Sequence, residues 1–250
     1  MRPLLLAALM LPLVATAAEC TVRSGPQANA VNELYTSEGC SSCPPADRWL
    51  SSFTAVSGTG RVIPLAFHVD YWDYIGWKDA FASARGTERQ RQIQRSAGAR
   101  YVYTPQVVLA GRDFPGWRSH ASWSSALEAI QGKAAAASIE LALKVDPVRG
   151  IEVASNVELR AGARADGLVV VVAATQNGLA SRVTAGENRG ERLGHDFVVR
   201  DFAVHRGVGR ASSSFKPAPG WNTANMSVAA FVQDARTGEI LQAISAPLCN

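Results

Sequence analysis

Two cysteines three positions apart are the residues of this chain best suited to chemistry. Cys40 and Cys43 stand in the segment Thr36-Ser-Glu-Gly-Cys-Ser-Ser-Cys-Pro-Pro-Ala-Asp47, between a strand-like run at 31–36 and a predicted helix at 43–53. A C-x-x-C pair at a strand-to-helix junction is typical of a dithiol redox site. The N-terminus of a helix offers free N–H groups and a positive dipole end, and both stabilise a thiolate. We therefore expect Cys40 to be the exposed nucleophile and Cys43 the resolving thiol.

A second candidate stretch follows the next predicted strand. The segment 68–81 holds five aromatic residues within eleven positions. Trp72 and Trp77 can form a shelf beside Cys40 that binds a substrate, or they can be loop anchors that pack onto the domain. His68 can likewise be a structural residue, or it can join Cys40 and Cys43 in a Cu(I) or Zn(II) site, because thiolates and imidazole suit both metals.

The N-terminal segment predicts export. Arg2 is followed by the apolar run 4–14 and by the small residues Ala15-Thr-Ala17, which is the pattern of a secretory signal peptide over residues 1–17. The apolar run is too short to span a bilayer, and we expect a periplasmic or secreted protein without a membrane span. In an oxidising compartment, Cys20 and Cys249, at the two ends of the mature chain, are expected to form a structural disulfide. The alternatives are that they remain free thiols or pair between molecules.

Net charge excludes one class of partner. The formal charge is +4, and the basic residues are dispersed along the chain. The densest basic run, 85–100, is interpreted as a solvated helix face, so we expect no nucleic-acid partner. No cofactor is predicted, and the oligomeric state remains open.

Predicted strands and helices alternate in the first half and give way to strands in the second. The first half is expected to contain strands at 31–36, 61–69 and 103–111, an antiparallel return at 112–117 across a turn at Gly111, and helices at 43–53, 88–97 and 122–137. The second half is expected to contain strands at 138–145, 151–159, 167–174, 197–204, 228–233 and 240–245. The fold class is thus α/β, with one domain at 18–137 and an antiparallel β-sandwich-like domain at 138–250. We expect the second domain to be a scaffold or partner surface without chemistry.

The first half resembles a thioredoxin-like domain. The C-x-x-C follows the first strand, and Thr104-Pro105 precedes the third. In that superfamily the proline is cis and faces the dithiol, so the resemblance implies this role for Pro105 and a place in the substrate groove for Thr104. Leu34 stands where ordinary thioredoxins bury an acid beneath the dithiol, which leaves the handling of protons open.

Most of the mature chain is similar to a family of exported bacterial thioredoxin-like proteins of unknown function. The segments that carry this similarity are 33–47, 66–73, 76–79, 103–106 and 228–234. The family resemblance implies a fold but no substrate.

Three functions follow from these observations. The leading hypothesis is an exported thiol–disulfide oxidoreductase that exchanges a Cys40–Cys43 disulfide with a protein or small-molecule thiol or disulfide. The alternative is a copper- or zinc-binding or delivery module that uses Cys40, Cys43 and His68. The third is a non-catalytic binding protein with a permanent Cys40–Cys43 disulfide.

Overall fold

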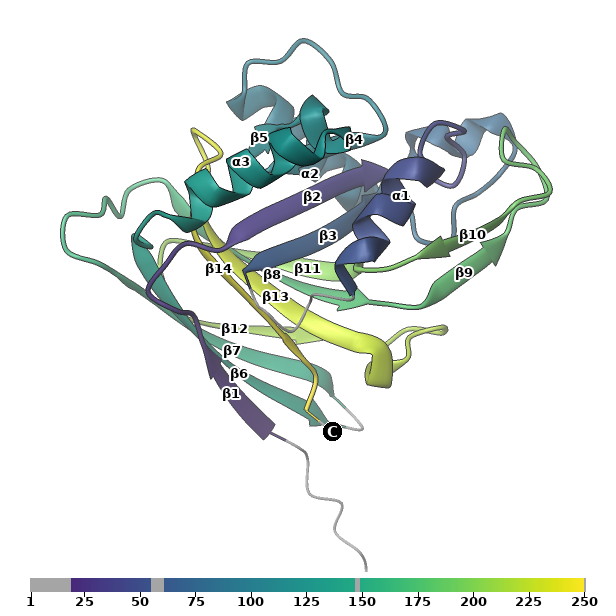
Figure 1. Cartoon of the computed structure of the whole chain (residues 1–250). Helices are drawn as coiled ribbons and strands as arrows, with labels where there is room; N and C mark the ends of the chain where they lie inside the picture. Colours follow the sequence, from purple (N-terminus) through teal and green to yellow (C-terminus); the bar gives the residue numbers. More distant parts are fainter. Residues whose placement is uncertain (1–18, 55–60, 147–148, 250) are drawn as a thin grey trace, which may run out of the picture.

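The computed structural model describes residues 19–54, 61–146 and 149–249 (Figure 1). The predicted signal peptide, residues 1–17, lies outside the described residues. The protein is a mixed α/β structure in which strands of several sheets predominate over a few helices. None of the helices in the described part of the chain is long and apolar enough to cross a membrane.

One eight-stranded sheet combines strands from both halves of the sequence. In spatial order it contains β14 (Ile240–Pro247), β13 (Met226–Asp234), β8 (Leu168–Gln176), β11 (Val198–Arg206), β3 (Val62–His68), β2 (Ala30–Thr36), β4 (Gln106–Leu109) and β5 (Arg112–Asp113). β3 runs parallel to β2, and it joins the second half through β11, where Val198 pairs with Ala66.

A four-stranded sheet packs against part of the large sheet. It contains β1 (Glu19–Arg23), β6 (Ala137–Asp146), β7 (Gly150–Leu159) and β12 (Gly209–Phe215), all antiparallel. The expected sandwich is therefore not separate from the first half. One of its layers continues the sheet of the first half, and β1, which precedes the predicted boundary at 137/138, belongs to the other layer.

The alternation of core residues explains this arrangement. In β8, Val170 and Val172 pack toward the four-stranded sheet, whereas Val171 and Ala173 pack toward the opposite face with Ile93. A strand that is apolar at every position needs cover on both faces. Among residues 138–146 and 149–249, no helix is long enough to cover the second face, and α2 (Ala84–Ser96) from the first half covers it.

The helices cover the two faces of the first-half strands. β2 sends Leu34 toward α1 (Pro44–Ser51) and Ala30 toward α3 (His120–Gln131), whereas Val31 and Tyr35 point to the face that α2 covers. α2 begins four residues before the predicted start, because the Ser83 side chain caps it by accepting a hydrogen bond from the Gly86 N–H. α3 ends six residues before the predicted end, because Ala137 already starts β6.

The smaller elements lie at the connections. The short 3-10 helices include η2 (Asp70–Ile75), η3 (Pro115–Arg118) and η4 (Thr223–Asn225). A two-stranded ribbon of β9 (Leu179–Arg182) and β10 (Arg192–His195) extends from the second half, and β10 contacts α1.

A disulfide joins Cys20 in β1 to Cys249 after β14, with a Cα–Cα distance of 5.9 Å. The closed loop spans a sequence separation of 229 residues, so the bond strongly restricts the unfolded chain. We expect a Cys20→Ser/Cys249→Ser double variant to lose about 3 kcal/mol of unfolding free energy in urea at unchanged pH. Retention of the wild-type urea midpoint would contradict this expectation, and the Cys40–Cys43 bond stays intact in both proteins as the internal control.

Candidate functional site

Cys40 and Cys43 form a disulfide with a Cα–Cα distance of 5.4 Å. α1 begins at Pro44, and Cys43 is its N-cap residue with helical backbone angles. The prediction that Cys40 is exposed is wrong for this disulfide-bonded form, because Cys40 and Cys43 are only 1% and 0% exposed. Ser41 and Ser42, between them, are exposed, so the disulfide lies directly beneath a solvent-facing turn.

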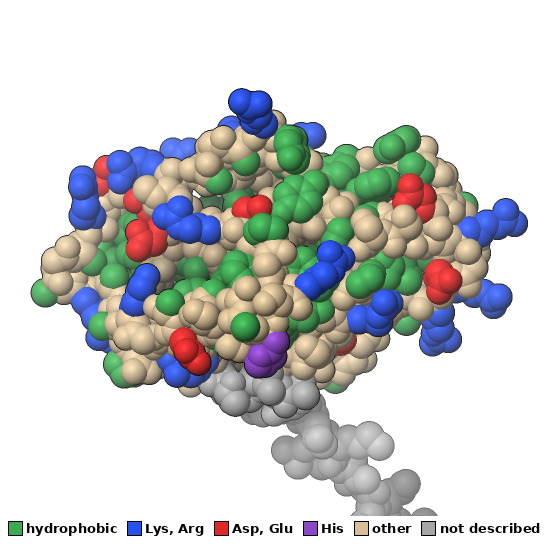
Figure 2. Space-filling view, turned by 45° about the horizontal axis from the view of Figure 1, so that its top comes forward, with side chains coloured by type: hydrophobic (Ala, Val, Ile, Leu, Met, Phe, Trp, Pro, Cys, Tyr) green, Lys and Arg blue, Asp and Glu red, His purple; other side chains and the backbone are tan. Residues whose placement is uncertain are grey.

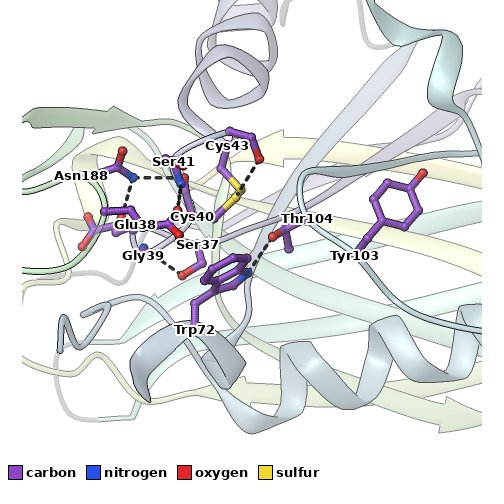
Figure 3. The surroundings of a disulfide bond; sticks show 12 residues. Ser37, Glu38, Gly39, Cys40, Ser41, Cys43, Trp72, Tyr103, Thr104 and Asn188 are labelled. Carbon is purple, nitrogen blue, oxygen red and sulfur yellow. Dashed lines mark hydrogen bonds between the residues drawn. A yellow bond between two sulfur atoms is a disulfide. The ribbon is translucent and has the colours of Figure 1, made fainter. Parts of the chain in front are cut away.

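The loop between β9 and β10, residues 183–191, covers the C-x-x-C segment (Figure 3). The buried Asn188 side chain donates to the carbonyl oxygens of Glu38 and Cys40, at 2.8 and 3.1 Å. Glu187 accepts a hydrogen bond from the Ser41 N–H at 3.0 Å. Within this largely exposed loop, the Asn188 side chain is buried, and its amide satisfies two carbonyl groups beside the disulfide.

Trp72 and Thr104 lie together on another side of the disulfide (Figure 3). The Trp72 indole N–H donates to the Thr104 hydroxyl at 2.7 Å, and the Thr104–Pro105 peptide bond is cis, the form that the resemblance implies. A Cβ on Gly39 would approach the Cβ of Trp72 to 3.0 Å. A side chain directly before Cys40 would therefore require Trp72 to shift by a few tenths of an ångström.

The other aromatic residues of this stretch divide between anchors and surface. The Trp77 indole N–H donates to the buried Glu38 at 2.8 Å, and the Tyr71 hydroxyl donates to Gln90 at 3.2 Å. Tyr74, in contrast, is 83% exposed. Both tryptophans thus fasten the 70–79 segment to the site, as the loop-anchor interpretation predicts, and Tyr74 remains available to a partner.

His68 is engaged with a carboxylate instead of the cysteines. Its Nδ1 lies 2.6 Å from Asp79 Oδ2, and both side chains are fully buried. Among residues 19–54, 61–146 and 149–249, no three His, Cys, Asp or Glu side chains are grouped so that they could hold a metal ion. The set Cys40, Cys43 and His68 is therefore not assembled as a metal site.

A second histidine–carboxylate pair lies beside the first. His195, from β10, places Nε2 3.1 Å from Glu38 Oε1. The His68 and His195 rings are 4.8 Å apart, so two buried pairs meet in one cluster. The Glu38 N–H also donates to Asp79 at 2.9 Å, which connects the pairs to the segment before Cys40.

Burial and the neighbouring groups shift the pKa values of the ionisable side chains in this cluster. Although burial opposes the charged form, the neighbouring His68 lowers the pKa of Asp79 from 3.8 to about 2. Asp79 in turn raises the pKa of His68 above its ordinary value against the effect of burial. For Glu38, burial acts upward, but the hydrogen bond from His195 leaves its pKa lowered. Asp47 behaves oppositely, because burial raises its pKa.

The His68–Asp79 pair predicts a pH dependence of stability. Because the pKa of Asp79 is lowered to about 2, its contribution is complete above the ordinary value of 3.8 and is lost as the pH falls through about 2. Because the pKa of His68 is raised, the contribution of His68 is complete below 6.5 and declines as the pH rises through the folded-state value. The pair therefore stabilises the fold most between these two ordinary values.

We expect the difference in unfolding free energy between the wild type and Asp79→Asn to shrink by about 2 kcal/mol between pH 5 and pH 2. Urea unfolding at each pH measures it. The matched control is Asp166→Asn, which alters an exposed carboxylate. Parallel pH profiles for the wild type and Asp79→Asn would show that the pair does not stabilise the folded state.

Several residues of the site escaped the sequence analysis. Asn188 and His195 come from the second half, more than 140 residues from the partners they contact, so that half contributes residues to the surroundings of the disulfide. Their types and spacing contain no signal for this contact. Asp47 could have been found, because it follows Cys43 by four residues in a predicted helix.

The class of protein is defined by this combination: a mixed α/β fold with a C-x-x-C disulfide at the start of its first helix, enclosed by elements from both halves. The chain belongs to the family described as "Protein of unknown function (DUF1223)", whose sequence profile matches residues 31–233. No curated protein matches it in sequence.

Two solved structures share the architecture. Protein AGR_C_4864 from Agrobacterium tumefaciens has 26% sequence identity and a TM-score of 0.65, with 91% of this chain and 97% of that chain covered. HBP35 of Porphyromonas gingivalis has 16% identity and a TM-score of 0.68, with 90% and 76% covered. The second likeness concerns the fold alone.

Proposed function

We propose that this protein is an exported thiol–disulfide oxidoreductase whose working couple is Cys40–Cys43. The observation that carries the proposal is the position of the disulfide at the N-cap of α1, directly beneath the exposed Ser41–Ser42 turn. At this position the positive end of the helix dipole favours the thiolate form of the reduced pair, although Pro44 and Pro45 carry no N–H group. Attack by a thiolate on one sulfur opens the bond and forms a mixed disulfide.

The order of elements supports a thioredoxin-like first half. β2, α1, β3, α2, β4, β5 and α3 follow one another, with β3, β2, β4 and β5 adjacent in the sheet. The C-x-x-C lies between β2 and α1, and Thr104–Pro105 directly precedes β4. This is the placement that the resemblance assigns to a redox pair and its facing proline.

Access to the disulfide requires movement of the 183–191 loop. Three hydrogen bonds, two from Asn188 and one to Glu187, connect it to the C-x-x-C segment. Each of these hydrogen bonds contributes a net free energy of about 1 kcal/mol. Together they are weak enough for a minor population of molecules with the loop displaced to exchange with the population in which the loop is in place. The buried disulfide is then protected at rest and reactive in the open form.

A protein partner fits the surface better than a small molecule alone. Tyr74 and Tyr101 are 83% and 72% exposed, and they flank the segments that carry Trp72 and Thr104. Exposed aromatic side chains are typical of binding surfaces, because they bury large areas on contact. On the face in Figure 2, Lys and Arg side chains are scattered between apolar ones, which suits a polypeptide better than a polyanion.

Export is part of the proposal. The structure contains two disulfides and, among the described cysteines, no free thiol. Disulfides persist in oxidising compartments and are rare in the cytosol, which favours the periplasm or the cell exterior.

The test is to trap the mixed disulfide in single-cysteine variants. Cys43→Ala leaves Cys40 as a free thiol and is incubated with glutathione disulfide under native conditions. Intact-mass measurement is expected to show one glutathione adduct at Cys40. Cys40→Ala, the matched control, is expected to react far more slowly, because Cys43 lies behind the turn. Absence of an adduct at Cys40, or equal reaction of both variants, would overturn the proposal in favour of a permanent structural disulfide.

Asn188→Ala is expected to increase the rate at which dithiothreitol reduces the native Cys40–Cys43 disulfide by about tenfold, because two hydrogen bonds of the closed loop are removed. The rate is measured by alkylation and mass spectrometry at low reductant concentration. Asn156→Ala serves as the control, because Asn156 bonds only the nearby Glu158 on the surface. An unchanged rate in Asn188→Ala would mean that the loop does not control access.

A further inference from the structure

Behind the C-x-x-C segment lies a buried group of acids and imidazoles that thiol exchange, as described so far, does not use. Its members share burial of at least nine-tenths of their surface and come from both halves of the chain: Glu38, Asp47, His68, Asp79 and His195. So many ionisable groups in one buried cluster are expensive unless they are paired, and such clusters concentrate at functional sites.

Asp47 is the member nearest to the disulfide along α1. It follows Cys43 by four residues, and its N–H donates to the Cys43 carbonyl at 3.1 Å. Cys43 already has helical backbone angles, so the two side chains lie on the same face of the helix, one turn apart. Both are buried, with 0% and 6% exposure. Side chains four residues apart on a helix have Cβ atoms about 5–6 Å apart, and this spacing places the Asp47 carboxyl group near the sulfur that leaves when the disulfide opens.

The imidazoles of His68 and His195 lie near Asp47, and each has one ring nitrogen without a hydrogen-bond partner. His68 Nδ1 is bound by Asp79 and His195 Nε2 by Glu38, whereas His68 Nε2 and His195 Nδ1 are buried without a partner. Unpaired buried polar atoms are rare and call for a role. Burial raises the pKa of Asp47, and the two histidines moderate that rise, while Asp79 adds to it. Burial thus favours the protonated form of Asp47, and the two imidazoles favour its carboxylate.

We propose that Asp47 exchanges a proton with the Cys43 sulfur as the Cys40–Cys43 disulfide opens and closes, with His68 and His195 positioning and stabilising its carboxylate. This inference rests on the proposed function. Asp79 binds the other ring nitrogen of His68, and Glu38 binds the other ring nitrogen of His195. These two carboxylates, the two imidazoles and Asp47 are the titratable groups of the cluster.

The chemistry balances as follows. A thiolate of a dithiol substrate attacks the Cys40 sulfur, a new S–S bond forms, and the Cys40–Cys43 bond breaks. The electron pair of the broken bond stays on the Cys43 sulfur, which takes the proton of the Asp47 carboxyl group. The second thiol of the substrate, as a thiolate, then releases Cys40, so the substrate is oxidised to a disulfide and the protein pair is reduced.

In the reverse direction Asp47 accepts the proton. Cys40 first carries a mixed disulfide, and the Cys43 thiol passes its proton to the Asp47 carboxylate. The resulting thiolate attacks Cys40 and expels the partner as a thiolate. A carboxylate in place before the attack removes the need for hydroxide, which is scarce at neutral pH.

The experiment follows this resolution step as a function of pH. Reduced full-length protein is mixed with glutathione disulfide, and the decay of the Cys40 mixed disulfide is measured by acid quench and mass spectrometry. The wild-type rate is expected to reach a plateau above an acidic inflection. Asp47→Asn is expected to be 10- to 100-fold slower at pH 6 and to rise with pH toward a thiol pKa of about 8.5. Glu128→Gln, on the exposed face of α3, is expected to match the wild type.

A second variant keeps Asp47 and alters a facing imidazole. Because His195 lowers the pKa of Asp47, His195→Gln is expected to move the acidic inflection to higher pH while a plateau remains. A purely structural role of the cluster would change all rates by a factor independent of pH. Profiles of Asp47→Asn and His195→Gln that run parallel to the wild type would overturn the proposal.

A third measurement needs no substrate and separates this inference from the proposed function. In Cys40→Ala, the thiolate absorbance of Cys43 is titrated with and without Asp47→Asn. Removal of a neighbouring carboxylate is expected to lower the thiol pKa of Cys43 by about one unit, because like charges raise it. An unchanged value would place Asp47 out of reach of the sulfur. A missing adduct at Cys40 in Cys43→Ala would instead refute the proposed oxidoreductase, whatever the titration of Cys43 shows.

Discussion

Arg89→Met is expected to lower the free energy of unfolding by about 3–5 kcal/mol, because it leaves a buried charge without its partner. Arg89, on α2, places Nε 2.5 Å from Glu33 Oε1 in β2, and their side chains are 4% and 0% exposed. The guanidinium also lies over the rings of Phe67 and Phe231, within the core between α2 and the large sheet. Urea unfolding with both disulfides intact measures the loss.

Two controls decide whether the unpaired charge is the cause. Arg95→Met removes an exposed partner of Glu88 on the same helix and is expected to cost less than about 1 kcal/mol. A Glu33→Leu/Arg89→Met double variant removes both charges and is expected to recover most of the stability, since apolar side chains of similar size replace buried pairs well. A double variant as unstable as Arg89→Met would show that shape, and not charge, dominates here.

Gly111→Ala is expected to destabilise the fold by more than about 4 kcal/mol or to prevent folding. Ala110 and Gly111 form the two-residue turn between β4 and β5, with φ values of 49° and 80°. An added Cβ at Gly111 would lie 1.8 Å from the carbonyl oxygen of Gly238, in the turn between β13 and β14. Two hairpin turns from the two halves of the chain meet at this point, and only a residue without a side chain allows the contact.

Gly98→Ala is the matched control for Gly111→Ala. Gly98 also has a positive φ, 65°, but a Cβ there would meet nothing within 4 Å. The control therefore carries only the backbone cost of the left-handed region, about 1 kcal/mol. Equal unfolding free energies for the two variants would mean that the contact with Gly238 is relaxed in solution. Thermal and urea unfolding distinguish the two cases.

Local patterns in the sequence were sufficient to place most elements of the first half. The run before Cys40, the prolines after Cys43 and the Gly111 turn each act within a few residues. The predicted strands at 31–36 and 61–69 accordingly agree with β2 and β3. A sequence records that β8 and β13 are apolar on both faces, but it does not record which elements cover them. The structure assigns one face to the four-stranded sheet and the other to α2.

The sequence by itself determined the C-x-x-C pair, its place before a helix, and the proline segment beside it, because all of these depend on neighbours in the chain. Only the tertiary structure decided that the pair is covered by the 183–191 loop and is backed by His68 and His195. The contacts that bring Asn188 and His195 to the site join the two halves across a shared sheet. Spacing along the chain carries no information about such contacts, because they depend on how the strands are ordered in space.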